Sequence, residues 1–169
     1  AEGRPVLGIC GGFQMLGRSV ADPHGVEAQP GVSEGLGLLE VDTELARDKR
    51  LAQVSGQASM GGGAPFGLRG YEIHMGVSTG AALARPAFVI DGRSEGACSG
   101  DGQVLGTYLH GVLDHPEAGA ALLAWAGLHS SQVVDTALLR EQSIDRIADA
   151  TAPVLDRLMA VLPPGAVAQ

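Results

Sequence analysis

The stretch that decides the fold is VLGICGGFQMLG, Val6–Gly17. A short apolar run ends at Cys10, which stands between Gly8 and Gly11, and the sequence then becomes helical in character. Gly-Ile-Cys-Gly-Gly is the cysteine counterpart of the nucleophile elbow G-x-S-x-G, a sharp strand-to-helix turn that exposes its central side chain. Glycines are expected on both sides because side chains there would collide. Two interpretations are open: a nucleophilic thiol, or a small buried cysteine in a tight turn.

Length and composition predict one globular domain over residues 1–169, since 45% apolar residues can form a single core. The net charge of −8, without a run of lysine or arginine, argues against nucleic acid or an anionic membrane surface as partner. No stretch has the length of a membrane span, and the first residues lack a signal-peptide pattern. We therefore expect a cytoplasmic protein.

The cysteines indicate neither a disulfide framework nor a metal site. Cys10 and Cys98 are the only two, and neither lies in a CxxC-like ligand pattern. The sequence therefore predicts free thiols and no metal.

The first part of the chain reads mainly as strands. The pattern predicts a strand over Pro5–Ile9 and a helix over Gly12–Val20, followed by a polar loop. The segment Met60–Gly70 is rich in glycine and is expected to be a flexible loop or the lip of a hairpin. Further strands are predicted over Gly37–Asp42, Leu51–Ser59, Tyr71–Gly76, Ala87–Asp91 and Gln103–Leu109.

The carboxyl-terminal part reads as helices. Asp114 and Glu117 have the spacing of a capping box, with a proline in the first turn. Apolar residues then recur with helical spacing from Ile144 to Leu162, and Pro153 is expected to kink or split that helix. Strands followed by helices indicate an α/β protein in which helices pack on a sheet.

A nucleophilic cysteine needs a base, and the five histidines are the candidates. His24, His115 and His129 occupy a polar loop, a helix cap and a helix end, where solvated side chains are expected. His110 ends the run GQVLGTYLHG, which places its imidazole at a strand end, where an elbow would also lie. A polar residue at a sheet edge is the other interpretation. His74, in GYEIHMG, is the second candidate.

Four segments in order carry a resemblance to a known family: GICGGFQMLG, GLGLLEV, GYEIHMG and DGQVLGTYLHGVLD. Together they resemble the CobB/CobQ-like branch of class I glutamine amidotransferases, and in particular the amidotransferase domain of cobyric acid synthases. The resemblance runs from about Pro5 to the carboxyl-terminal helices. It implies an α/β, flavodoxin-like fold in which helices flank a mixed sheet.

The resemblance also implies roles for single residues. Cys10 would attack the side-chain amide carbon of L-glutamine, and the Gly11 N–H would hold the oxyanion. His110 would take the thiol proton and pass it to the departing ammonia, which leaves a thioester for water to hydrolyse. Gln14 matches a position that contacts bound glutamine, although an ordinary first-turn helix residue is the alternative.

The motif GYEIHMG, Tyr71–Gly76 after its first glycine, would form the wall on which glutamine lies. Tyr71 is therefore a substrate-binding candidate, and His74 is either a substrate-side or a structural residue.

Two departures from the wider class stand out. Most class I amidotransferases carry a glutamate two residues after the histidine, whereas this sequence has Val112 there and resembles the CobB/CobQ-like branch in that respect. Asp114 is a candidate substitute, but its position favours a helix cap.

The second departure is that only Ala1–Arg4 precede the elbow strand, whereas the family has further strands, a second oxyanion donor and an ATP-binding synthetase domain before it. No P-loop pattern occurs in the 169 residues. We therefore expect part of a two-domain synthase that lacks the first strands of its domain. The chain itself would need no cofactor, while ATP, Mg²⁺ and the corrinoid would bind the synthetase domain. An uncovered sheet edge would favour self-association.

The expected function is thus the glutaminase part of cobyric acid synthase, which releases ammonia for ATP-dependent amidation of adenosylcobyrinic acid a,c-diamide in cobalamin biosynthesis. One alternative is an amidotransferase of the same branch that serves another acceptor, such as a cell-wall precursor. The other is a non-catalytic docking module.

Overall fold

The computed structural model describes residues 3–128 and 135–161. The chain divides into two compact units, Ala1–Val134 and Asp135–Gln169. Within the described residues, every strand belongs to the first unit, and the second unit contains one helix. None of the helices in these ranges is long and apolar enough to cross a membrane.

A small sheet in the first unit carries the elbow. Its strands are β1 (Val6–Ile9), β9 (Val104–Thr107) and β8 (Ala97–Cys98), in that spatial order. β1 and β9 run parallel, with Ile9 opposite Thr107, so their carboxyl ends lie at the same edge. On its other side β1 has no strand partner within the described residues. Self-association through that edge stays a prediction.

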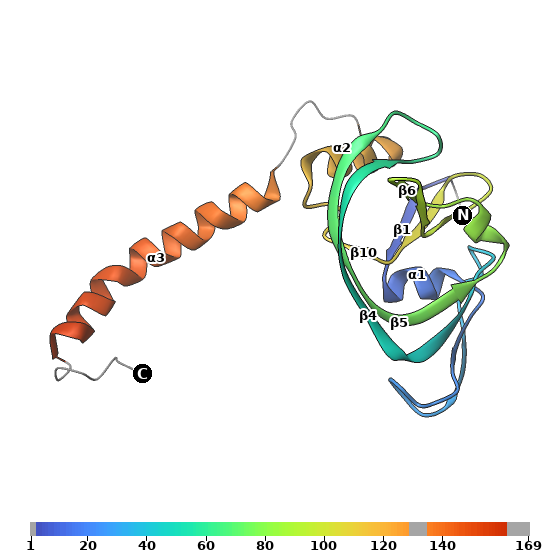
Figure 1. The fold of residues 1–169 in the computed structure, drawn as a ribbon, viewed down its shortest axis with the longest axis horizontal. Coiled ribbons are helices and arrows are strands. Elements are labelled where there is room, and N and C mark those ends of the chain that lie inside the picture. The colour runs from blue at the N-terminus through green and yellow to red at the C-terminus, as the bar shows by residue number, and fades with distance from the viewer. Residues whose placement is uncertain (1–2, 129–134, 162–169) are drawn as a thin grey trace. The chain divides into compact units, whose positions relative to one another are not determined.

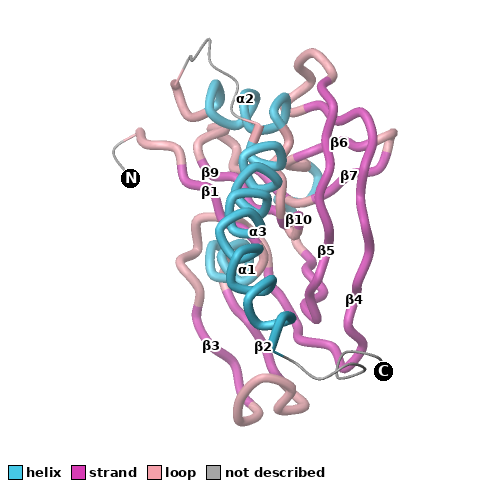
Figure 2. Tube along the Cα trace, turned by 90° about the vertical axis from the view of Figure 1, so that its left-hand side faces the viewer, coloured by secondary structure: helices cyan, strands magenta, loops and turns pink. Residues whose placement is uncertain are grey.

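A second, larger sheet is built around a long hairpin. In spatial order its strands are β10 (Leu109–His110), β5 (Phe66–Thr79), β4 (Asp42–Ser59), β2 (Ser19–Asp22) and β3 (Gly31–Glu34); β6 (Phe88–Ile90) pairs with β4 and with β7 (Arg93–Glu95). β4 and β5 lie side by side along most of their length (Figure 2). They curve around β1 and the first helix, so the hairpin forms a wall beside the elbow (Figure 1).

The helices of the described residues are α1 (Gly11–Leu16), the 3-10 turn η1 (Ala81–Ala84), α2 (Pro116–Trp125) and, in the second unit, α3 (Thr136–Val161).

Two hydrophobic clusters form the core of the first unit, on either side of the small sheet. One cluster joins α1 to η1, β8 and β9, with Phe13 and Leu16 fully buried. The other joins the hairpin to α2, β9 and β10, and Leu109 and Val112 lie at its centre. The residues around His110 are therefore anchored in the core.

The predicted strand at Pro5–Ile9 is confirmed, but the following helix is shorter than the predicted Gly12–Val20. It ends at Leu16, and Ser19 begins a strand that pairs in parallel with β4. The backbone makes this change at Gly17, which has no room for a side chain beside the carbonyl of Val41. After Gly17 the backbone bonds to the 41–42 segment instead of continuing the helix: the Arg18 N–H donates to the Val41 carbonyl, and Ser19 pairs with Asp42.

The strand predicted over Gly37–Asp42 is wrong, since β4 begins only at Asp42. The N–H groups of residues 36–39 bond instead to the carbonyls of Met15, Leu16 and Gly17. These carbonyls end a helix and have no partners within it. The apolar side chains that suggested a strand, Leu39 and Val41, are buried beside α1. This segment therefore covers a helix end rather than pairing in a sheet.

The glycine-rich segment predicted over Met60–Gly70 is the lip of the β4–β5 hairpin, and it is shorter than expected because β5 already begins at Phe66. The strands predicted over Leu51–Ser59 and Tyr71–Gly76 lie within β4 and β5. Both are longer than predicted because polar, exposed residues continue the ladder at the sheet surface.

The predicted capping box would place Asp114 at the N-cap of α2, whereas the structure has His115 at that position. The residue that caps α2 is His115, without a side-chain capping bond, and Pro116 follows as the first helical residue. The carboxylate of Glu117 accepts a hydrogen bond from the Gly67 backbone N–H, which joins α2 to β5. Glu117 therefore bonds across the fold instead of to its own helix.

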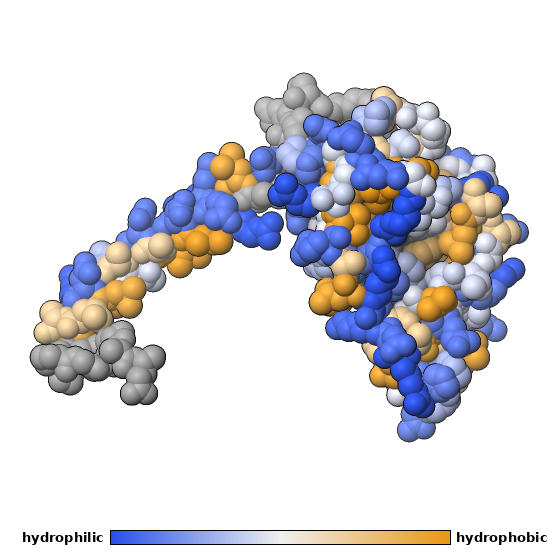
Figure 3. Space-filling view, in the orientation of Figure 1, coloured by the Kyte–Doolittle hydropathy of each residue, from blue (hydrophilic) through white to orange (hydrophobic). Residues whose placement is uncertain are grey.

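The predicted split at Pro153 is also wrong, because α3 runs through it as one helix from Thr136 to Val161. A proline removes a single backbone donor, and the surrounding turns keep theirs. Hydrophobic residues gather along much of one side of α3 (Figure 3). Ile144, Ile147 and Leu158 of the predicted apolar pattern are exposed on this helix. The last residue of that pattern, Leu162, lies outside the described residues.

Candidate active site

Cys10 occupies the single position between β1 and α1, as the elbow pattern predicts. Its backbone has φ 54° and ψ −112°, a conformation that residues other than glycine rarely adopt. Two hydrogen bonds hold it there: the Cys10 N–H donates to the Thr107 carbonyl at 2.8 Å, and the Gln14 N–H donates to the Cys10 carbonyl at 3.2 Å. Such strain persists only where the surroundings enforce it, and it is common at active sites.

The glycines beside Cys10 do not all serve the purpose that the sequence suggests. A Cβ atom on Gly8 would lie 2.7 Å from the backbone of Gly12, so the strand and the helix can meet only with glycine at residue 8. In contrast, nothing lies within 4 Å of a Cβ built on Gly11 or Gly12. The expected collision therefore exists on one side of the turn only, and the space over Gly11 is open.

The thiol of Cys10 is half-buried and donates a hydrogen bond to the Ile73 carbonyl of β5, at 3.5 Å. Both cysteines are free, as predicted. The N–H of Gly11 belongs to the first turn of α1, where backbone donors have no partner within the helix. Because Gly11 is exposed, its N–H is accessible to an oxyanion, which agrees with the predicted role. The oxyanion role itself stays a prediction.

His110 lies on β10 directly opposite Tyr71 of β5. The two rings are stacked, with centroids 5.0 Å apart and planes inclined by 9°. The Nε2 atom of His110 is buried and has no hydrogen-bond partner among the described residues. Leaving such a polar atom unpaired costs about 1–3 kcal/mol, so this nitrogen is suited to bond a group that arrives with a ligand.

Cys10 and His110 reach the same strand of the wall. The thiol contacts the carbonyl of Ile73, and the imidazole lies against Tyr71, two residues earlier on β5. Two residues of a strand span about 7 Å. No hydrogen bond joins Cys10 to His110 directly within the described part of the chain. The fold thus brings the predicted nucleophile and base to neighbouring positions along β5, and their catalytic pairing stays a prediction.

His74 lies on the face of β5 opposite to that of Tyr71, because side chains alternate along a strand and the two residues are three positions apart. Its ring is stacked on Tyr108, with centroids 3.7 Å apart, and its Nδ1 atom lies 2.8 Å from the Gly76 carbonyl oxygen. Burial lowers the pKa of His74, against the smaller opposing effects of that carbonyl and of Glu72. These contacts favour the structural alternative for His74, while the predicted role of Tyr71–Gly76 as the wall on which glutamine lies stays a prediction.

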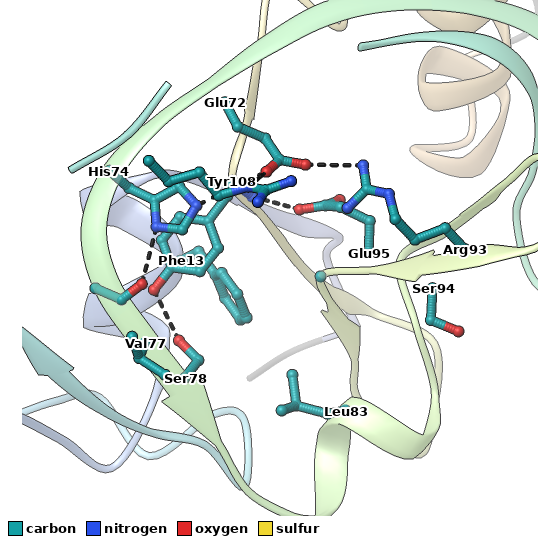
Figure 4. A pocket seen from close by; sticks show the side chains of 13 residues that line it. Phe13, Glu72, His74, Val77, Ser78, Leu83, Arg93, Ser94, Glu95 and Tyr108 are labelled. Atoms are coloured by element: carbon teal, nitrogen blue, oxygen red, sulfur yellow. Dashed lines mark hydrogen bonds and ion pairs between the residues drawn. The ribbon is translucent and has the colours of Figure 1, made fainter. Parts of the chain in front are cut away.

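A cavity of about 280 Å³ lies on the His74 side of β5, and buried acidic residues line part of it (Figure 4). Glu72, which is 3% exposed, lies between Arg50 and Arg93 and forms an ion pair with each; the distance to Arg93 is 2.8 Å. Burial acts to raise the pKa of Glu72, but the two guanidinium groups outweigh it and hold the pKa below its usual range. Glu72 is therefore a buried carboxylate that stays charged.

Glu95 is the second buried acid beside this cavity. It accepts hydrogen bonds from the Thr107 hydroxyl at 2.6 Å and from the Tyr108 N–H at 2.7 Å. Burial raises its pKa to about 7, against the opposing effect of those two hydrogen bonds. Glu95 fixes the segment between β9 and β10, and this segment leads directly to His110.

The side chain of Gln14 contacts one of a bonded pair of hydroxyl groups, those of Tyr108 and Ser78, beside the same cavity. Its amide nitrogen lies 3.5 Å from the Tyr108 hydroxyl, and that hydroxyl is 2.7 Å from the hydroxyl of Ser78. Sequence reasoning assigned no role to Tyr108, Ser78 or Glu95. Tyr108 lies inside the quoted motif GTYLHG, so a signal was present, whereas nothing marks Ser78 and Glu95 before the fold brings them together.

The structure also gives the positions of the remaining candidates. Val112 is fully buried in the core, which explains why an apolar residue stands where many class I enzymes carry a glutamate. Asp114 is not the helix cap, since His115 takes that position. His115 is half-buried and not solvated as predicted, and its Nδ1 atom is buried without a hydrogen-bond partner among the described residues. His24 is exposed as predicted, and His129 lies outside the described residues.

The fold and the site together define the class: an α/β protein with mixed sheets, a cysteine at a nucleophile elbow and a histidine at a neighbouring strand end. Residues 1–118 match the family model of the CobB/CobQ-like glutamine amidotransferase domain. The chain therefore belongs to the CobB/CobQ-like glutamine amidotransferase domain family, whose members typically are enzymes that use glutamine. The match includes the elbow, GYEIHMG and GTYLHG.

No group of three or more potential metal ligands of the His, Cys, Asp and Glu types lies together in the described ranges.

Proposed function

We propose that this chain is the glutaminase part of a cobyric acid synthase, with Cys10 as nucleophile and His110 as general base and acid. The observation that carries the proposal is that both residues lie against β5: Cys10 has a strained backbone and its thiol donates to the Ile73 carbonyl, while His110 pairs with Tyr71 and its buried Nε2 has no hydrogen-bond partner among the described residues. A cysteine in such a turn presents its sulfur to a substrate, and a base must lie near it. The proposed fold type is that of the flavodoxin-like class I amidotransferases.

The proposed reaction begins with proton transfer from the Cys10 thiol to His110. The sulfur then forms a bond to the side-chain amide carbon of L-glutamine, and the amide oxygen becomes an oxyanion that the Gly11 N–H stabilises. When the intermediate collapses, the C–N bond breaks and His110 gives its proton to the leaving nitrogen, so ammonia departs. Water, deprotonated by His110, then attacks the thioester, which yields glutamate and restores the Cys10 thiol.

The first experiment measures ammonia and glutamate released from L-glutamine. We expect Cys10→Ser and His110→Ala each to lower the rate at least about 100-fold, which is the usual size of a nucleophile or base effect. His24→Ala is the matched control, because this histidine is exposed and far from the site in sequence. Wild-type rates in Cys10→Ser or His110→Ala would show that the assignment is wrong.

The second part of the proposal concerns the acceptor, the molecule to which the released ammonia is transferred. The family match supports glutamine as the ammonia donor. The resemblance of the four motifs to cobyric acid synthases is what supports adenosylcobyrinic acid a,c-diamide as the molecule that receives the ammonia. We propose that a synthetase domain with ATP and Mg²⁺ activates its carboxylates. When the protein and that synthetase domain are incubated together with ATP, glutamine and the a,c-diamide, we expect amidated corrinoid as the product. Amidation of a cell-wall precursor instead, with the corrinoid unchanged, would show that the acceptor is different.

A further inference from the structure

Tyr71 and His110 form a cross-strand pair whose geometry bears on the proposed catalysis. They lie directly opposite each other on β5 and β10, and their rings are nearly parallel at 5.0 Å. Tyr71 is 41% exposed, so it is not simply a core residue. Stacking between two aromatic rings restricts rotation of both, and a flat ring beside an imidazole fixes the plane in which its two nitrogens lie.

The backbone around the pair is shaped to allow this contact. A Cβ on Gly70 would lie 2.5 Å from the His110 carbonyl oxygen, so only glycine lets the two strands come this close. On the other strand Gly111 has φ 70°, which turns the chain sharply away after His110. The Cβ position of Gly111 lies 3.8 Å from the Tyr71 ring. One glycine beside each ring thus permits the stack.

The position that carries a glutamate in most class I enzymes does not orient His110 in this chain. β10 is only two residues long, and the side chain two residues later, Val112, is buried in the core and offers no oxygen to the imidazole. The Nε2 atom has no hydrogen-bond partner among the described residues. A base must be held in its productive orientation, since misplacement by about 1 Å can cost about 100-fold in rate.

We infer that Tyr71 is the positioning residue of His110: its ring, by stacking, holds the imidazole with Nε2 toward the Cys10 thiol. This inference rests on the proposed function. Tyr71 then acts through His110 and not by contact with glutamine, in contrast to the substrate-binding role that the sequence predicts. The ring carries the effect, and the phenol hydroxyl is not needed for it.

The test compares Tyr71→Leu with Tyr71→Phe, which keeps the ring and removes only the hydroxyl. Thr79→Ala is the matched control, because Thr79 lies on the same strand and is exposed. In glutamine hydrolysis we expect Tyr71→Leu to lower kcat about 10- to 100-fold with KM changed less than about twofold. Tyr71→Phe and Thr79→Ala should stay within about twofold of wild type.

A second readout does not depend on glutamine. The rate of Cys10 alkylation by iodoacetamide, followed by mass spectrometry across pH, reports how well His110 takes the thiol proton. We expect Tyr71→Leu to show the pH profile of His110→Ala, and Tyr71→Phe that of wild type. Circular dichroism and the thermal midpoint of each variant verify that the fold is retained.

Three results would overturn the inference. The first is a raised KM with unchanged kcat in Tyr71→Leu, which would make Tyr71 a substrate contact. The second is equal loss in Tyr71→Phe and Tyr71→Leu, which would assign the effect to the hydroxyl. The third is an alkylation profile in Tyr71→Leu that matches wild type. Failure of the proposed function itself looks different, because Cys10→Ser and His110→Ala would then keep wild-type ammonia release.

Discussion

Replacing Glu95 by glutamine should change how the stability of this protein depends on pH. Burial raises the pKa of Glu95 from 4.5 to about 7. The folded protein therefore keeps a proton on this carboxyl that the unfolded chain releases from about pH 4.5 upward. Glu95 contributes stability below pH 4.5, and this contribution is lost as the pH rises to about 7.

The size of the effect follows from the shift. Each pKa unit corresponds to 1.36 kcal/mol, so a shift of about 2.5 units gives about 3 kcal/mol of folding free energy lost between pH 4.5 and pH 7. Glu95→Gln is uncharged throughout. Its amide oxygen can accept from the Tyr108 N–H, and its NH₂ group can donate to the Thr107 hydroxyl oxygen in place of the present bond.

Urea unfolding at pH 5, 6, 7 and 8 measures this difference. We expect the free energy of unfolding of Glu95→Gln, relative to wild type, to rise by about 2.5 kcal/mol from pH 5 to pH 8, because part of the full shift is already lost at pH 5. Glu34→Gln, an exposed residue on β3, is the matched control and should show no such rise. A constant difference between Glu95→Gln and wild type at all four pH values would refute the reasoning.

Two further predictions concern the elbow and the buried ion pairs. Gly8→Ala should destabilise the fold by about 2 kcal/mol, because the new Cβ meets the Gly12 backbone at 2.7 Å, whereas Gly12→Ala has open space and should cost nothing. Glu72→Gln should cost about 2 kcal/mol at neutral pH, since Arg50 and Arg93 lose a charged partner but remain half-exposed to water. Because the pKa of Glu72 is lowered, this cost should shrink as the pH falls below about 4.5.

Denaturant unfolding tests both predictions. Equal stability of Gly8→Ala and Gly12→Ala would contradict the close approach of strand and helix at the elbow. A Glu72→Gln penalty that stays constant down to pH 3 would contradict a charged carboxylate between the two arginines.

The elbow could be predicted from the sequence because its information is local. The glycines around Cys10 and the change from an apolar strand to a helix lie within a dozen residues, and the structure has that turn. His110 could be selected for a similar reason, since its strand and the glycine after it mark a strand end. The family resemblance carried by the motifs agrees with the match of residues 1–118.

The parts that could not be predicted depend on contacts between distant segments. Residues 36–39 look like a strand, but the carbonyls of α1 take their N–H groups. Tyr71 and His74 belong to one motif, yet the alternation of β5 sends them to opposite faces, which composition alone cannot show. The raised pKa of Glu95 and the stacking of Tyr71 on His110 likewise depend on contacts with β5, β9 and β10 that exist only in the folded protein.

Covalent labelling of the two cysteines tests whether Cys10 attacks glutamine. The reagent is a diazo-ketone analogue of glutamine, and peptide mass spectrometry at neutral pH locates the adduct. Cys98 is an internal control, because burial raises the pKa of its thiol. We predict an adduct on Cys10 alone, formed more slowly when L-glutamine is in excess. Equal labelling of Cys10 and Cys98, or a rate that glutamine does not change, would contradict a glutamine-attacking nucleophile at the elbow.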